Sequence, residues 1–174
     1  MNIILTGFMG SGKTAVGKRL AKRLGYTFLD TDLLIEEKTG KSISDIFSKD
    51  GEDYFRDIET LILTELTGIN DHVIATGGGI VTRKENIRRL RELGFIIWLK
   101  ASPETIFKRV STKTHRPLLK VDNPLEQIKR LMSQREQSYS EADLTIDTDG
   151  YEVDDIVNII IKKITNVRGA QKGR

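Results

Sequence analysis

The sequence has no cysteine among its 174 residues, which excludes disulfides, thiolate metal ligands and a thiol nucleophile. It also lacks any apolar run approaching the roughly 18 to 20 residues that span a bilayer, so we expect no membrane partner. The net charge of +3 is too small to indicate a nucleic-acid partner, and the chain has neither a basic block with interleaved aromatic residues nor a zinc-finger spacing. A bound metal ion would therefore have to be held by oxygen atoms.

No basic region precedes the first apolar residues of the chain, so we expect no signal peptide and a cytoplasmic location. Internal repeats and low-complexity segments are absent as well. A length of 174 residues, with 38% hydrophobic and 30% charged residues, suits one compact domain with a substantial core. We place this single domain at residues 1–165 and expect a disordered tail at residues 166–174.

The most informative segment that is present covers residues 7–14, GFMGSGKT, and has the spacing of a phosphate-binding P-loop. It follows a strand-like run at residues 3–6 and leads into a stretch in which Val16, Leu20 and Leu24 repeat at helical spacing. In such a loop the backbone N–H groups converge on phosphate oxygens, and the following helix presents its positive dipole end. The segment therefore predicts a nucleoside triphosphate site.

Within this loop, Lys13 is expected to lie on the β- and γ-phosphates and Thr14 on Mg²⁺. The residues that we expect to bind the nucleotide here are Gly10, Ser11, Gly12, Lys13, Thr14 and Ala15.

Strand-like and helical segments alternate along the rest of the chain. The apolar, strand-like runs are residues 3–6, 26–29, 72–75, 95–99 and 144–146. Helical periodicity or capping signals predict helices after residue 42, at 52–66 and 84–93, after residue 102, at 123–139 and at 153–164. This alternation predicts an α/β fold with a parallel sheet covered on both faces, and ligands bound beyond the carboxyl ends of the strands.

Two carboxylates follow the second strand-like run. Asp30 and Asp32 alternate around Thr31, so in an extended segment both side chains would project to the same side and share one site. The alternative interpretation is that Asp32 only caps a helix that begins at Leu33.

Six motifs, in this order and spacing, resemble those of the shikimate kinase family over nearly the whole chain: GFMGSGKT, FLDTD, FRDIE, TGGGIV, HRPLL and SQREQSY. The resemblance implies a three-layer P-loop NTPase fold, similar to that of nucleoside monophosphate kinases, with a five-stranded parallel sheet. It also implies a substrate-binding helical region at residues 32–66 and a lid at residues 111–120. The implied reaction transfers the γ-phosphoryl group of ATP to the 3-hydroxyl of shikimate, giving shikimate 3-phosphate and ADP in the chorismate pathway to aromatic amino acids.

On the nucleotide side, the resemblance gives Asp30 a water-mediated role near Mg²⁺. It makes Arg116, in the lid, a catalytic residue that reaches across to the phosphates. Arg109 resembles the position that covers adenine, although a surface arginine on a helix is an alternative.

On the acceptor side, the resemblance makes Asp32 a ligand of the substrate hydroxyls and the candidate base, beside Lys13 and Arg116 as catalytic residues. Arg56 and Arg135 match the residues that bind the substrate carboxylate, a role that suits two guanidinium groups. Taken alone, either arginine would be read as part of a solvated helix face. The remaining substrate contacts implied are the glycines of a turn after a strand, Gly77, Gly78 and Gly79.

Two other functions stay open. One is another small-molecule P-loop kinase, acting on gluconate or a nucleoside monophosphate. The other is a nucleotide-dependent interaction switch, which the sequence disfavours because the D-x-x-G pattern at residues 147–150 comes too late and no N-K-x-D motif is present. We expect ATP, Mg²⁺ and shikimate as the partners of a monomeric enzyme.

Overall fold

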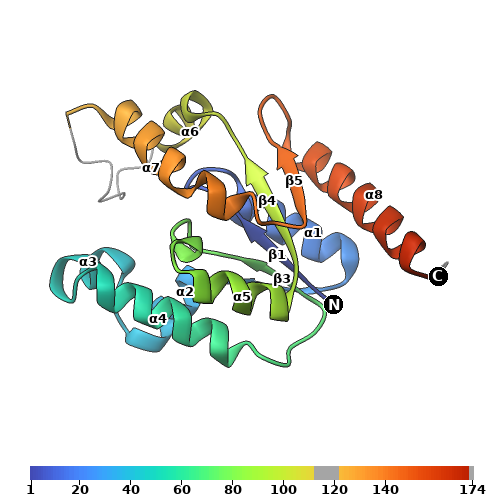
Figure 1. Cartoon of the computed structure of the whole chain (residues 1–174), viewed down its shortest axis with the longest axis horizontal. Helices are drawn as coiled ribbons and strands as arrows, with labels where there is room; N and C mark the ends of the chain where they lie inside the picture. Colours follow the sequence, from blue (N-terminus) through green and yellow to red (C-terminus); the bar gives the residue numbers. More distant parts are fainter. Residues whose placement is uncertain (112–121, 173–174) are drawn as a thin grey trace.

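The computed structural model describes residues 1–111 and 122–172, which form an α/β unit around a five-stranded sheet (Figure 1). The strands are β1 (Asn2–Thr6), β2 (Thr27–Asp30), β3 (His72–Ala75), β4 (Gly94–Lys100) and β5 (Leu144–Asp147). Their order across the sheet is β2-β3-β1-β4-β5, and every neighbouring pair is parallel. The predicted five-stranded parallel sheet is therefore confirmed.

The helices connect these strands. They are α1 (Lys13–Leu24), α2 (Thr31–Thr39), α3 (Ile43–Lys49), α4 (Glu52–Glu65), the short 3₁₀ helix η1 (Ile80–Thr82), α5 (Lys84–Leu93), α6 (Pro103–Val110), α7 (Pro124–Tyr139) and α8 (Val153–Lys172). The predicted capping signals act as expected, because the side chains of Ser42 and Ser102 accept hydrogen bonds from backbone N–H groups in the first turns of α3 and α6. Gly25 ends α1 in the left-handed conformation, with φ of 69°.

The strands send alternate side chains to two separate cores, one on each face of the sheet. Ile4, Ile74 and Trp98 pack with residues of α2 to α5, whereas Ile3, Leu5 and Val73 pack with residues of α1 and α8. Figure 1 shows the same division, with α1 and α8 on one side of the sheet and α2, α4 and α5 on the other. The sheet is thus the middle of three layers, as a parallel sheet buried on both faces requires.

A third, smaller core lies beyond the carboxyl end of the sheet. Phe8 of the P-loop packs there with Ile106 of α6 and Ile128 of α7. This contact ties the phosphate loop to the two helices that flank residues 112–121.

The structure differs from the sequence prediction at the end of β2. Thr31 is the first residue of α2, so Asp30 and Asp32 do not alternate along an extended segment. Asp30 is the N-cap of this helix, and its side chain accepts a hydrogen bond from the Asp32 N–H at 3.1 Å. The alternative interpretation, in which Asp32 only caps a helix that begins at Leu33, is wrong for the same reason.

The C-terminal helix is longer than expected. The backbone of α8 continues to Lys172, through most of the segment at residues 166–174 that we predicted to be disordered. In the parts of the chain at 1–111 and 122–172, no helix is both long and apolar enough to cross a bilayer.

Candidate active site

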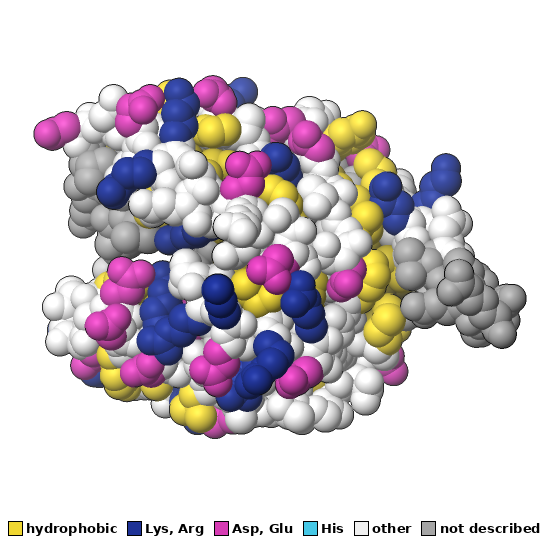
Figure 2. All heavy atoms as spheres, in the orientation of Figure 1, with side chains coloured by type: hydrophobic (Ala, Val, Ile, Leu, Met, Phe, Trp, Pro, Cys, Tyr) yellow, Lys and Arg dark blue, Asp and Glu magenta, His cyan; other side chains and the backbone are white. Residues whose placement is uncertain are grey.

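Most of the predicted site residues that the structure describes gather at the carboxyl ends of β1, β2 and β3. The P-loop follows β1, Asp30 ends β2, and the Gly77–Gly79 turn follows β3. This edge is where ligands bind in open parallel sheets. In the space-filling view a hollow opens between α7 and the pair α3 and α4, and Lys and Arg side chains border it on both sides (Figure 2).

The P-loop holds Lys13 in a fixed position. The Lys13 Nζ donates hydrogen bonds to the carbonyl oxygens of Gly7 at 2.7 Å and Phe8 at 2.9 Å, and the side chain is buried. A turn in which the Ser11 N–H donates to the Phe8 carbonyl at 3.1 Å closes the loop. The ammonium group therefore lies within the phosphate loop.

Thr14 and Asp30 meet beside the loop. The Thr14 hydroxyl donates to the Asp30 Oδ2 at 3.0 Å. These two oxygen ligands suit Mg²⁺, which is usually held by one or two protein oxygens together with water and substrate phosphates. Among residues 1–111 and 122–172 there is no cluster of three or more His, Cys, Asp or Glu side chains that could hold a metal ion by itself.

Asp32 lies against the Gly77–Gly79 turn, together with a second carboxylate. A Cβ atom built on Gly77 would stand 2.7 Å from the Asp32 Oδ1 and 2.8 Å from the Glu59 Oε1, so any larger residue would displace one of the two carboxylates. The Gly77 N–H donates to the Thr31 hydroxyl at 3.0 Å, which joins the start of α2 to this turn. Asp32 and the glycine turn therefore lie together, as we predicted, although Asp32 belongs to helix α2 and not to an extended segment.

Arg56 reaches the same turn from α4. Its side chain is buried between Glu59, at 2.6 Å from Nη1, and Glu52, at 2.8 Å from Nη2. A Cβ atom on Gly79 would overlap the Arg56 guanidinium. The interpretation of Arg56 as part of a solvated helix face is thereby wrong.

Arg135 approaches from the opposite side, on α7. Its Nη1 donates to the Gly78 carbonyl at 3.3 Å, and its guanidinium carbon lies 5.5 Å from the centroid of the Phe8 ring. Like Arg56, it is buried. The two arginines, which are far apart in the sequence, thus converge on one glycine turn, at the sheet edge that also carries the P-loop.

Glu59 is a site residue that the sequence analysis missed. Its side chain is fully buried and one oxygen accepts from Arg56. The other oxygen has no hydrogen-bond partner among residues 1–111 and 122–172. Burial raises the pKa of Glu59 from its ordinary 4.5 to about 7, Arg56 and Arg135 lower it, and Asp32 raises it. A signal existed, because Glu59 stands three residues after Arg56 in the FRDIE motif and so faces the same side of α4.

This carboxyl makes the stability of the protein depend on pH. Because the pKa of Glu59 is higher in the folded state, the folded state keeps a proton that the unfolded state has lost above pH 4.5. The contribution of Glu59 to the free energy of unfolding is therefore largest below pH 4.5, and it falls by about 3 kcal/mol as the pH rises from there to above about 7.

Urea unfolding of the wild type and of Glu59→Gln, from about pH 5 to about pH 8, measures this contribution directly, because the glutamine cannot titrate. We expect the wild type to lose stability relative to Glu59→Gln across this range. Parallel profiles for the two proteins would show that Glu59 has an ordinary pKa.

The remaining predicted residues lie near the nucleotide side. Arg109 donates from Nη1 to the Gly10 carbonyl at 3.3 Å and from Nη2 to the Thr148 carbonyl at 3.4 Å, so it lies beside the P-loop rather than free on the surface of α6. Arg116 and almost all of the predicted lid at residues 111–120 lie outside the described residues.

The phosphate loop and a second site bordered by arginines lie together at one edge of a sheet with this strand order. This combination is that of the P-loop kinases that act on small molecules. The family model for shikimate kinase matches residues 9–165. The chain belongs to the shikimate kinase family.

Curated relatives match over nearly their whole length. The chain is 51% identical to the shikimate kinase of Thermodesulfovibrio yellowstonii over 162 residues, which cover 93% of this chain and 94% of that protein. It is 44% identical to the enzyme of Caldanaerobacter subterraneus over 168 residues, covering 97% and 98% of the two chains.

Solved structures agree with this assignment. The shikimate kinase of Acinetobacter baumannii in complex with shikimate is 41% identical and superposes with a TM-score of 0.91, over 95% of this chain and 93% of that one. A gluconokinase from Sinorhizobium meliloti covers 98% of this chain and 95% of its own, but at 16% identity and a TM-score of 0.65 it shares the fold alone.

Proposed function

We propose that this protein transfers the γ-phosphoryl group of ATP to the 3-hydroxyl of shikimate, giving shikimate 3-phosphate and ADP on the route to chorismate and the aromatic amino acids. The observation that carries the proposal is the convergence of Arg56 and Arg135, from opposite sides, on the turn that also faces Asp32. Two guanidinium groups beside a carboxylate suit an acceptor that has one carboxylate and several hydroxyls. The relative from Acinetobacter baumannii, whose structure contains shikimate, supports the same acceptor.

On the acceptor side, we assign the shikimate carboxylate to Arg56 and Arg135, and a ring hydroxyl to Asp32. We also assign acceptor contacts to Gly77, Gly78 and Gly79. The N–H groups of Gly78 and Gly79 are the candidate donors, because the Gly77 N–H already donates to the Thr31 hydroxyl. Asp32 is also the group that would accept the proton of the attacking hydroxyl.

On the nucleotide side, we assign the phosphates to the backbone N–H groups of the P-loop and to Lys13. Mg²⁺, when bound, neutralises phosphate charge, and the residues that would hold it are Thr14 directly and Asp30 through water. Arg109 would cover the adenine, and we retain the prediction that Arg116 reaches the phosphates from the lid.

The chemistry that this arrangement supports is mainly positioning. Phosphoryl transfer passes through a loose transition state, so orientation and charge stabilisation contribute more than proton abstraction. The arginine pair fixes the acceptor by its carboxylate, Asp32 turns the hydroxyl toward the γ-phosphoryl group, and Lys13 stabilises the charge on that group. We further propose that the enzyme is a cytoplasmic monomer that binds neither nucleic acid nor membrane.

An acceptor panel tests the substrate. ADP formation from MgATP is measured with shikimate, quinate, gluconate and nucleoside monophosphates offered separately, and again without Mg²⁺. We expect rapid, Mg²⁺-dependent ADP formation with shikimate and rates near the acceptor-free background with the others. Preference for gluconate or a nucleoside monophosphate would overturn the proposal, and so would slow, GTP-selective hydrolysis that needs no acceptor.

A further inference from the structure

The carbonyl oxygen of Gly78 receives two donors from one helix. The Tyr139 hydroxyl donates to this oxygen, and so does the Arg135 Nη1, at 3.3 Å. Tyr139 follows Arg135 by four residues on α7, so both side chains leave the same face of the helix. The residue that we assign to the acceptor carboxylate therefore shares its backbone partner with a tyrosine that has no assigned role.

The Tyr139 side chain is buried and packed against a second ring. It is 3% exposed, and its ring stacks on the Trp98 ring of β4 with 5.6 Å between centroids and 17° between planes. Burial raises the pKa of Tyr139 to about 12, so the hydroxyl remains a donor at physiological pH. The packing fixes the place of the Tyr139 hydroxyl, and with it the place of the Gly78 carbonyl.

Two consequences follow for the acceptor site. A peptide unit is planar, so fixing the Gly78 carbonyl also fixes the direction of the Gly79 N–H on the other side of the same peptide. In addition, the Gly78 carbonyl is only partly exposed to water, so a protein donor stabilises it. Without the tyrosine hydroxyl, Arg135 would be the remaining donor to this carbonyl among the contacts of the described residues. The same guanidinium would then have to serve both the carbonyl and the acceptor.

We propose that Tyr139 is a positioning residue for the acceptor: its hydroxyl holds the Gly78 carbonyl, so that the Arg135 Nη1 can leave this carbonyl and bind the acceptor carboxylate. This inference rests on the proposed function, because it takes Arg135 as a ligand of shikimate. In this proposal Tyr139 acts through Arg135 and touches neither the nucleotide nor the acceptor.

The variant Tyr139→Phe removes the hydroxyl and keeps the ring that stacks on Trp98. We expect the KM for shikimate to rise roughly tenfold, as the loss of one hydrogen bond to a positioned group implies. The KM for ATP and kcat should stay within about twofold, because no nucleotide contact changes. Trp98 is the single tryptophan of the chain and touches Tyr139, so its fluorescence can report shikimate binding without nucleotide and confirm the weaker affinity.

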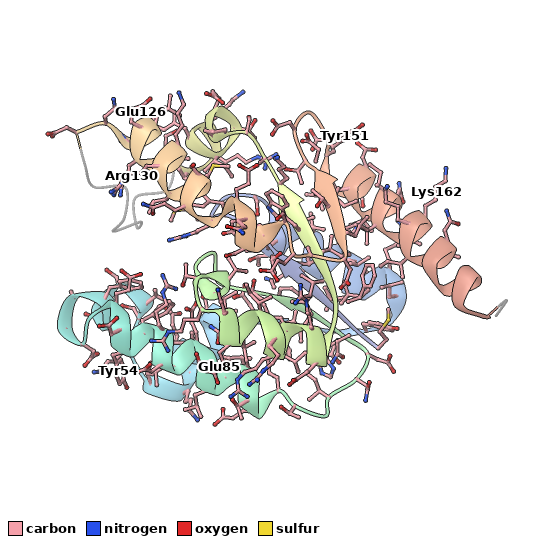
Figure 3. The ribbon with its side chains drawn as sticks, viewed as in Figure 1. Tyr54, Glu85, Glu126, Arg130, Tyr151 and Lys162 are labelled. Atoms are coloured by element: carbon pink, nitrogen blue, oxygen red, sulfur yellow. The ribbon has the colours of Figure 1, made fainter. Side chains whose placement is uncertain are left out.

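The matched control is Tyr151→Phe, which removes a hydroxyl from a half-exposed tyrosine between β5 and α8 (Figure 3). It should leave all constants unchanged. A second test combines Tyr139→Phe with Arg135→Ala. If Tyr139 acts through Arg135, the rise in the shikimate KM caused by Tyr139→Phe should nearly vanish in the Arg135→Ala background.

An unchanged shikimate KM in Tyr139→Phe would overturn the inference, and so would KM effects that simply add in the double variant. A variant that only loses thermal stability, with shikimate and ATP constants intact, would show a purely structural role. These outcomes are distinct from failure of the proposed function, which would appear as a wild-type enzyme that forms no ADP in response to shikimate.

Discussion

Replacing Lys13 with methionine is expected to lower kcat by a factor of about 10³, with the KM for shikimate changed by less than about threefold. The Lys13 ammonium is buried at the P-loop and donates to the Gly7 and Phe8 carbonyls, so its charge lies within the loop that we assign to the phosphates. Methionine keeps most of the side-chain volume and removes this charge. The loss should fall on the chemical step, because the charge on the transferred group grows in the transition state.

Steady-state kinetics with both substrates varied will measure this effect, and Lys18→Met on the same helix is the control. Lys18 is exposed and lies over the Phe28 ring, away from the P-loop, so its loss should leave kcat unchanged. A Lys13→Met enzyme that retains more than about a tenth of the wild-type kcat would contradict the role of Lys13 in the transition state.

The second large effect is expected for Arg56→Ala, which should raise the KM for shikimate by a factor of about 10² to 10⁴ and leave the KM for ATP nearly unchanged. Two charge-assisted hydrogen bonds to a carboxylate contribute about 1.5 to 3 kcal/mol each, and 1.4 kcal/mol corresponds to about tenfold in affinity. The guanidinium lies against Gly79, on the acceptor side of the site, whereas the P-loop is formed by other elements.

Arg56→Ala also leaves the buried Glu59 without its cation, which should lower the stability of the protein. The double variant Arg56→Ala/Glu59→Gln separates the two effects, because it removes the unpaired acid. We expect it to recover stability in urea unfolding while the shikimate KM stays high. Recovery of the KM together with stability would mean that Arg56 serves the fold and does not bind the acceptor. Arg88→Ala, at an exposed position on α5, controls for the change in net charge.

Much of the architecture could be predicted because local chemistry sets it. Helical periodicity, the serine caps at residues 42 and 102, and the glycine that ends α1 each act within a few residues, so the sequence contains the whole signal. The alternation of strands and helices then determines a parallel sheet, and ligand binding at its carboxyl edge. The P-loop was predictable for the same reason, because the groups that bind phosphate are consecutive backbone N–H groups of one short segment.

The errors arose where two local signals compete. An extended segment through Asp30 and Asp32 and a helix capped by Asp30 are both consistent with the sequence, and the hydrogen bond from the Asp32 N–H to the Asp30 side chain favours the helix. The end of α8 was placed too early because the apolar periodicity weakens after residue 164, whereas the backbone remains helical to Lys172.

The residues that were missed depend on tertiary burial. Glu59 and Tyr139 are ordinary residues in the sequence, and each becomes significant because the fold buries it against the glycine turn beside an arginine of its own helix. Their spacings of three and four residues from Arg56 and Arg135 were visible beforehand. The meeting of α4 and α7 at one turn was not, because it requires the whole sheet to be in place.

The central claim is that this site joins the γ-phosphoryl group of ATP to one hydroxyl of shikimate, and the identity of the product tests it most directly. Phosphorus and proton NMR of a completed reaction with MgATP and shikimate should show one phosphate monoester at the 3-oxygen for each ADP formed. Inorganic phosphate with shikimate unchanged, or a phosphate on another hydroxyl, would contradict it.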